Sequence, residues 1–304
     1  MIRTFSEIHD AILKEKPRRL AVAAAADTDV LTAVKMAVDR KLAGAVLVGD
    51  EAKIRQIAAD LDFNLNASGV EVMNEPDGAL AARKAVAMVS SGEAHLLMKG
   101  LVGTADLLRA VLDKEQGLRT GRLLSHVGLL QPEGYDRLFY LTDGGMNIAP
   151  NLAQKVDIIN NAVDMAHLLD NPQPKVACLA AVEVVNPDMP ATLDAAALTM
   201  MSQRGQFKGC IVDGPLALDN AVSVEASRHK GINSPAAGQA DILMVPEIES
   251  GNVIYKAMVY FGHVKSAGVI VGARTPIVLT SRADTPESKL NSMAVAVLMA
   301  ARKK

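Results

Sequence analysis

The stretch VLTSRADTPESKLNS, residues 278–292, joins an apolar run to a segment with the composition of a helix start. Val278, Leu279 and Thr280 are typical of the end of a buried strand. The Asp-Thr-Pro sequence at 284–286 is favoured at the cap and in the first turn of a helix. Ser281 and Arg282 stand between the two, so a hydroxyl and a fixed positive charge lie where the predicted strand passes into the predicted helix.

The same alternation of apolar runs and amphipathic stretches continues along the chain. Most runs are apolar at successive positions, which is typical of strands covered on both faces in a mainly parallel sheet. Strands are predicted at 20–25, 44–49, 95–100, 123–130, 138–143, 175–182, 209–215, 241–247 and 268–281, and helices at 27–42, 77–92, 151–174 and 286–304. This alternation predicts an α/β fold.

One piece departs from the pattern. The stretch LLQPEGYDRLFYLT, residues 129–142, contains two strand-like runs joined through Pro-Glu-Gly, which predicts an antiparallel pair. A chain of 304 residues is long enough for two domains. We therefore place a change of domain near this hairpin.

Composition excludes several classes of protein. A net charge of −2 and an aromatic content of 3% argue against a nucleic-acid surface. No apolar run approaches the roughly 20 residues of a membrane span, and residues 1–16 lack the apolar core of a signal peptide, so we predict a cytoplasmic protein without membrane partners. Cys178 and Cys210 lie in apolar runs without metal-site spacing and are predicted to be core residues.

Several familiar catalytic motifs are absent from the sequence. It lacks GxGxxG, GxxxxGK(S/T), GxSxG and HExxH, which argues against a common dinucleotide-binding domain, a P-loop NTPase, a serine hydrolase and a zinc protease. The six histidines are scattered and none pairs at metal-ligand spacing. No metal site is predicted.

Polar loops follow several of the predicted strands. They span 98–109, 141–150, 212–221 and 246–256, and the stretch 278–292 adds a fifth. Ligands of open α/β sheets bind beyond the carboxyl ends of the strands. Loops rich in Gly, Asn, Ser, Thr and Arg suit an anion, because backbone N–H groups and helix N-termini face it. Singly, each feature is typical of a turn, a cap or a solvated charge. Together they predict an anion-binding cleft.

The motifs in these loops resemble those of a known family. They are MKGLVGTADLLR (98–109), LTDGGMNIAP (141–150), GPLALDNA (214–221), PEIESGNVIYKA (246–257) and GARTPIVLTSRADTPESKLNS (272–292). As a set they resemble the phosphate acetyl/butyryltransferase family, most closely its butyryl branch. The resemblance implies a reversible reaction in which acyl-CoA and orthophosphate give acyl phosphate and coenzyme A, with no cofactor beyond these substrates.

The resemblance also implies an architecture. The fold would be similar to that of isocitrate and isopropylmalate dehydrogenases, with two α/β domains and a cleft between them. The first domain would comprise residues 1–128 plus 283–304, and the second residues 129–282. The second domain would join two copies into a homodimer or a larger homo-oligomer.

Site residues follow from the matching motifs. The family's signature pair falls on Ser281 and Arg282, so the arginine would bind phosphate through its planar fork and the serine would donate to the oxyanion or the departing thiolate. The phosphate- and CoA-binding candidates are Lys99, Thr104, Arg109, Asp143, Gly144, Gly251, Asn252, Tyr255 and Lys256. A surface ion pair between Arg282 and Asp284 is the alternative for the signature arginine.

One departure concerns the general base. The acetyl branch has an acidic residue six positions after the signature arginine, and Ser288 occupies that position here. Glu287 is adjacent and Asp284 is close, so either carboxylate is a candidate to accept the thiol proton of coenzyme A. We favour Glu287.

Three other functions stay open. Acetyl transfer differs from butyryl transfer by pocket width, and one methylene is worth only about 1–3 kcal/mol. A decarboxylating dehydrogenase would need clustered aspartates for a metal, and Asp213, Asp219 and Asp241 are not grouped on one helical face. A non-catalytic coenzyme A-binding protein is the third possibility.

Overall fold

The computed structural model describes residues 1–281 and 284–303. The chain divides into two compact units. One unit comprises Met1–Thr4 and Leu123–Ser266, and we call it the central unit because most of it comes from the middle of the sequence. The other comprises Phe5–Arg122 and Ala267–Lys304, and we call it the flanking unit because its two segments lie on either side of residues 123–266 in the sequence. The expected domain boundaries, the cleft and the likeness to isocitrate dehydrogenase stay predictions.

The flanking unit is built on strands that are mostly parallel. In spatial order they are β3 (Val70–Asn74), β2 (Gly44–Gly49), β1 (Arg19–Ala23), β4 (Leu96–Lys99), β11 (Ile277–Val278) and β10 (Lys265–Val271). All neighbouring pairs are parallel except β10 with β11. The carboxyl ends of β1, β4 and β11 therefore lie at one edge.

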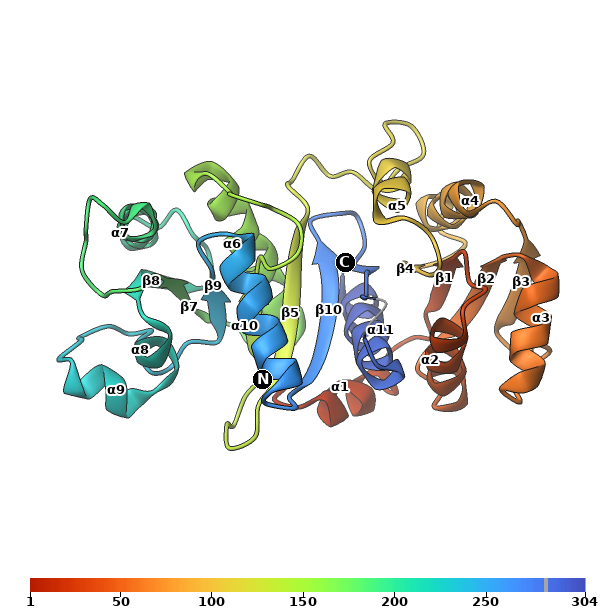
Figure 1. Cartoon of the computed structure of the whole chain (residues 1–304), viewed down its shortest axis with the longest axis horizontal. Coiled ribbons are helices and arrows are strands. Elements are labelled where there is room, and N and C mark those ends of the chain that lie inside the picture. Colours follow the sequence, from red (N-terminus) through yellow and green to blue (C-terminus); the bar gives the residue numbers. More distant parts are fainter. Residues whose placement is uncertain (282–283, 304) are drawn as a thin grey trace. The chain divides into compact units, whose positions relative to one another are not determined.

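Helices cover both faces of these strands (Figure 1). They are α1 (Phe5–Ile12), α2 (Thr28–Asp39), α3 (Glu51–Asp60), α4 (Gly78–Ser91), α5 (Thr104–Val111) and α11 (Pro286–Arg302). Helix α4 packs on β1 and α5, while α11 packs on α1 and α2. The amphipathic pattern explains these helices, and α11 is buried at every position from Lys289 to Met299.

The central unit combines an antiparallel hairpin with parallel strands. In spatial order the strands are β5 (Ser125–Gln131), β6 (Phe139–Thr142), β9 (Ile242–Met244), β7 (Lys175–Leu179) and β8 (Ile211–Leu216). The helices are α6 (Leu152–Leu168), α7 (Pro190–Gln203), α8 (Leu218–Val222), α9 (Val224–His229) and α10 (Ile248–Tyr260). Strands β5 and β6 are antiparallel, which confirms the predicted hairpin at 129–142.

The mixed α/β fold confirms the predicted class, and two of the differences in detail concern strands. The predicted strand 268–281 is wrong, because β10 and β11 form an antiparallel pair separated by a turn at Gly272, whose φ is +94°. Strand β3 was not predicted, because it is an edge strand without a buried residue. Within the described residues, no helix has the length and apolar character needed to cross a membrane.

Candidate active site

In the central unit, the loop after β6 is organised by one carboxylate. Asp143 is buried, and its Oδ1 accepts hydrogen bonds from the backbone N–H groups of Gly145 and Met146 at 2.8 and 2.9 Å. Its Oδ2 accepts from the backbone N–H of His126 at 3.1 Å and from Asn147 Nδ2 at 2.6 Å. Four donors compensate the carboxylate for its lost hydration. Asp143 thus shapes the loop.

Helix α10 approaches this loop closely. The Nδ2 of Asn252 donates to the carbonyl of Gly144 at 3.2 Å. A Cβ on Gly251 would lie only 2.8 Å from the Cα of Gly144, so this contact requires glycine. The helix begins at Ile248, and Glu247 is its cap. Gly251 therefore lies in the first turn of α10, whereas the sequence predicted that the helix begins near Gly251.

An aromatic pair lies beside the same loop. The rings of His126 in β5 and Tyr255 in α10 meet edge to face, with centroids 6.2 Å apart. Gly128 leaves room for them, since a Cβ there would lie 2.9 Å from the Tyr255 ring. Lys256 is exposed on α10. The sequence predicted no role for His126. Its position near the start of the first strand of the predicted hairpin, opposite the loop at 141–150, could have marked it as a candidate site residue.

In the flanking unit, the β4–α5 loop places two further candidates. Lys99 is buried and its Nζ donates to the carbonyl of Gly100 at 3.3 Å. Gly100 is pressed against β1, because a Cβ there would lie 2.2 Å from the carbonyl oxygen of Ala24. Thr104 is the first residue of α5 and is exposed. The loop therefore brings a lysine and a helix N-terminus to the same sheet edge.

Arg109 lies at the far end of α5. Its side chain is 68% exposed and pairs with Asp106, with Nη1 2.6 Å from Oδ1. It also lines a pocket of about 320 Å³ together with Arg83 and Asp113. The geometry is that of an exposed ion pair whose guanidinium is accessible to a ligand.

We expect Arg109→Ala to weaken phosphate or coenzyme A binding by about tenfold, the effect of losing a charged hydrogen bond. Thermal stability should stay unchanged, because exposed ion pairs contribute little. Isothermal titration with each ligand tests this. If the variant binds both ligands normally, Arg109 is a surface residue that takes no part in binding.

The signature pair follows β11 in the sequence. Arg282 lies outside the described residues. Ser281 is exposed, and its backbone N–H donates to Asp284 Oδ2 at 2.7 Å, while Asp284 N–H donates back to the Ser281 carbonyl at 3.2 Å. Thr285 caps α11 by accepting from the backbone N–H of Ser288 at 3.2 Å. Asp284 is therefore tied to Ser281 and Thr285 is the cap.

Glu287 occupies a different side of the helix start. It is exposed in the first turn of α11. Burial lowers the pKa of His9 in α1, and the Glu287 carboxylate opposes that shift. Glu287 thus lies on the α1 side of α11, whereas Asp284 lies beside Ser281.

A buried lysine at this turn was not predicted. Lys289 is 3% exposed, and its Nζ donates to the main-chain carbonyl of Asp284. The nearest carboxylate oxygen, in Asp29 of α2, lies 3.8 Å away. The sequence carries no signal for this burial, because lysine side chains are almost never fully buried.

The two cysteines and the late aspartates have other surroundings. Burial raises the pKa of the Cys178 thiol to about 12 and that of Cys210 to about 11, so neither is a ready thiolate. In the part of the chain that the structure describes, no three His, Cys, Asp or Glu side chains form a group that could hold a metal ion. Asp213 instead accepts a hydrogen bond from Ser234, and Asp241 accepts one from the backbone of Lys175.

Comparison with known proteins gives consistent matches. The family model described as "Phosphate acetyl/butaryl transferase" matches residues 78–297, a range that contains every candidate residue. A phosphate butyryltransferase from Clostridium acetobutylicum is 50% identical over 303 residues and covers 100% of both chains. A phosphate acetyltransferase from Thermotoga maritima is 46% identical over 285 residues, 94% of this chain and 96% of its own. The crystal structure of a branched-chain phosphotransacylase from Enterococcus faecalis V583 aligns with a TM-score of 0.82 at 35% identity, covering 94% of this chain and 100% of that one.

Proposed function

This chain belongs to the phosphate acetyl/butyryltransferase family and transfers an acyl group between coenzyme A and orthophosphate, and we propose that the acyl group is butyryl or one of similar size. The observation that carries the acyl assignment is the 50% identity, over the full length, to a phosphate butyryltransferase. The reaction is acyl-CoA plus phosphate to acyl phosphate plus coenzyme A, in either direction.

In the forward direction a phosphate oxygen attacks the thioester carbonyl. Orthophosphate needs to be held for this step, and the N-terminus of α11 supplies a partial charge of about +0.5. We assign the bidentate grip on phosphate to Arg282. Ser281, fixed by its backbone bonds to Asp284, donates to the oxyanion or the departing thiolate.

In the reverse direction the thiol of coenzyme A loses its proton as its sulfur attacks the acyl phosphate. Glu287 is our candidate base and Asp284 the alternative. No covalent enzyme intermediate is part of this scheme. The absence of a metal or an organic cofactor stays a prediction, as does the cytoplasmic location.

A thiol-release assay with acetyl-, propionyl-, butyryl-, isobutyryl- and hexanoyl-CoA tests the proposal. We expect kcat/KM to be highest for the four-carbon chains, with acetyl-CoA at least about tenfold poorer, because each buried methylene adds about 0.8 kcal/mol. A maximum at acetyl-CoA would assign the chain to the acetyl branch. If none of these acyl-CoA substrates is turned over, the protein is instead a non-catalytic coenzyme A-binding protein.

The oligomeric state belongs to the same proposal, and we place a homodimer contact on α10. Of the thirteen residues of α10, all described, Gly251 alone is buried. Val253 and Tyr260, seven residues apart on one helical face, are 66% and 58% exposed, and Phe261 is 87% exposed. These exposed apolar side chains, on a helical face that also carries the exposed Lys256, suit contact with a second copy of the chain.

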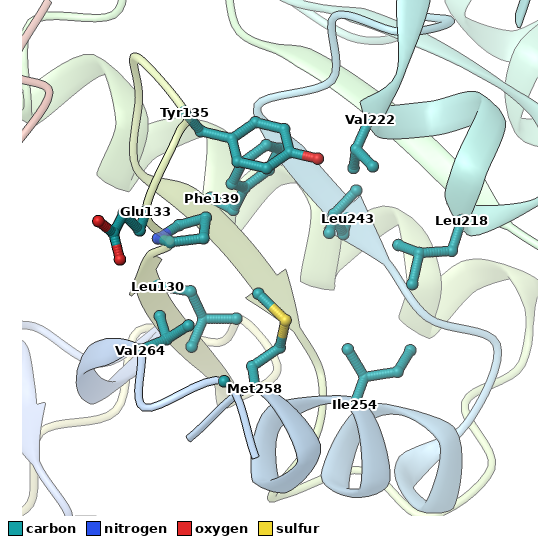
Figure 2. A pocket seen from close by; sticks show the side chains of 12 residues that line it. Leu130, Glu133, Tyr135, Phe139, Leu218, Val222, Leu243, Ile254, Met258 and Val264 are labelled. Carbon is teal, nitrogen blue, oxygen red and sulfur yellow. The ribbon is translucent and has the colours of Figure 1, made fainter. Parts of the chain in front are cut away.

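A pocket beside α10 adds to this surface. It has a volume of about 360 Å³, and Leu218, Ile254 and Met258 line it with other apolar side chains (Figure 2). Side chains from a partner copy would fill such a pocket and remove its apolar lining from water.

We expect Phe261→Asp to weaken self-association by at least about thirtyfold, the effect of losing an aromatic anchor. Sedimentation velocity across a dilution series measures this. Leu13→Asp is the matched control, because Leu13 is 58% exposed but belongs to the flanking unit. A monomeric parent protein, or a variant that dimerises as tightly as the parent, contradicts the assignment of this face.

A further inference from the structure

Lys289 occupies an unusual place at the start of α11. It is the fourth residue of the helix, which begins at Pro286. Its side chain is 4% exposed, and its Nζ donates to the main-chain carbonyl of Asp284. Its nearest carboxylate belongs to Asp29, which is 54% exposed and 3.8 Å away. The close partner of the buried ammonium is therefore a main-chain carbonyl, and its ion pair with the exposed Asp29 is a long one.

This placement is electrostatically unfavourable by itself. A cation near a helix N-terminus opposes the helix dipole, and a buried charge loses its hydration. Methionine would fill the same space with its apolar stem and would avoid both costs. Packing alone therefore does not account for a lysine here.

Another lysine of this chain shows what an ordinary buried ion pair looks like. Lys155 in α6 is 6% exposed, and its Nζ lies 2.6 Å from the carboxylate of Asp194 in α7. In that pair each charge has a close partner of opposite sign on the neighbouring helix. Lys289 instead directs its donor to the backbone of the turn that follows β11.

The contacts of Asp284 connect Lys289 to Ser281. The carbonyl of Asp284 accepts from Lys289, while its carboxylate accepts from the Ser281 N–H at 2.7 Å and its own N–H donates to the Ser281 carbonyl at 3.2 Å. A shift of the Asp284 backbone would therefore move Ser281 as well.

We propose that Lys289 is a positioning residue that holds Ser281 at the end of β11 through Asp284, and that its ammonium adds positive potential where orthophosphate binds. The inference rests on the proposed function, because it takes the turn after β11 as the phosphate-binding end of the site. It predicts an effect on phosphate kinetics that is separate from any effect on folding.

The first variant is Lys289→Met. We expect the phosphate KM to rise by about tenfold or more and kcat to fall, the size of effect expected when a charged hydrogen bond is lost. The KM for butyryl-CoA should stay within about twofold, and the midpoint of thermal unfolding should stay level or rise, because a buried charge is removed. Lys289→Arg keeps the charge and a donor and should recover part of the phosphate KM.

Two controls separate positioning from stability. Lys155→Met leaves Asp194 without its partner, so it should lower the unfolding midpoint and leave both KM values unchanged. Asp29→Asn removes only the long ion pair with an exposed carboxylate and should leave the phosphate KM within about twofold.

Three outcomes would overturn the inference. The first is a Lys289→Met variant with parental phosphate KM and kcat. The second is a Lys289→Met variant that loses stability and affinity for both substrates together. The third is an Asp29→Asn variant that reproduces the Lys289→Met kinetics, since Lys289 would then act only as a tie between α2 and α11. Turnover by the parent protein is measured first, so failure of the proposed function is seen separately.

Discussion

Asp143→Ala is expected to lower the free energy of unfolding by about 3 kcal/mol and to reduce turnover by at least about a hundredfold. The buried carboxylate accepts four hydrogen bonds, from the backbone of Gly145, Met146 and His126 and from the side chain of Asn147. Alanine would leave these donors unpaired. The loop would then lose the conformation that places Gly144 against α10. Urea denaturation and initial rates with butyryl-CoA measure the two effects.

Asp136→Ala is the matched control for this variant. Asp136 belongs to the same unit, but its side chain is 64% exposed and pairs with the neighbouring Arg137. Its removal should change the free energy of unfolding by no more than about 0.5 kcal/mol and leave turnover intact. Asp143→Asn keeps the shape of the side chain but turns one acceptor into a donor. Its free energy of unfolding and its turnover should therefore lie between those of Asp143→Ala and the parent protein. Parental stability in Asp143→Ala would show that the loop is held by its backbone alone.

Much of the fold was predictable because local periodicity and local turn chemistry determine it. The hairpin 129–142 follows from a Pro-Glu-Gly turn between two apolar runs, and α4 follows from its Asp77 cap and a left-handed Gly92 at its end. The errors arise where the local signal is weak. Residues 272–276 between β10 and β11 include a glycine and a proline, but the apolar runs on either side predict one strand. Strand β3 is short and has no buried residue, although three of its five residues are apolar.

The site was predictable at the level of loops but not of contacts. Parallel strands bring their carboxyl ends to one edge, so loops at 98–109 and 278–292 could be assigned to a site from strand positions alone. The pairing of His126 with Tyr255 depends on how α10 lies across β5. The direction of the Lys289 side chain depends on the turn at Asp284. Such tertiary contacts leave little trace in the periodicity of a single sequence.

Glu287→Gln is expected to lower kcat for coenzyme A-dependent turnover by about a hundredfold, within the usual range for a general base. The amide keeps the size of the side chain but cannot accept the thiol proton. The carboxylate lies in the first turn of α11. A weak base can still act here, because proton transfer accompanies attack of the sulfur on the acyl phosphate. The KM for phosphate should change little.

Asp284→Asn and Ser288→Ala complete the assignment of the base. Asp284 Oδ2 accepts from the Ser281 N–H, so the asparagine variant should disturb Ser281 and raise the KM for phosphate. Loss of a general base would instead lower kcat. Ser288 donates its backbone N–H to the Thr285 cap, and its exchange for alanine removes only the hydroxyl that accepts from Thr285 Oγ1 at 3.2 Å, so Ser288→Ala should be nearly silent. If Asp284→Asn loses kcat at unchanged KM while Glu287→Gln keeps parental turnover, the base is Asp284. If neither amide lowers kcat, solvent or another loop removes the thiol proton, and the start of α11 serves only to bind the anion.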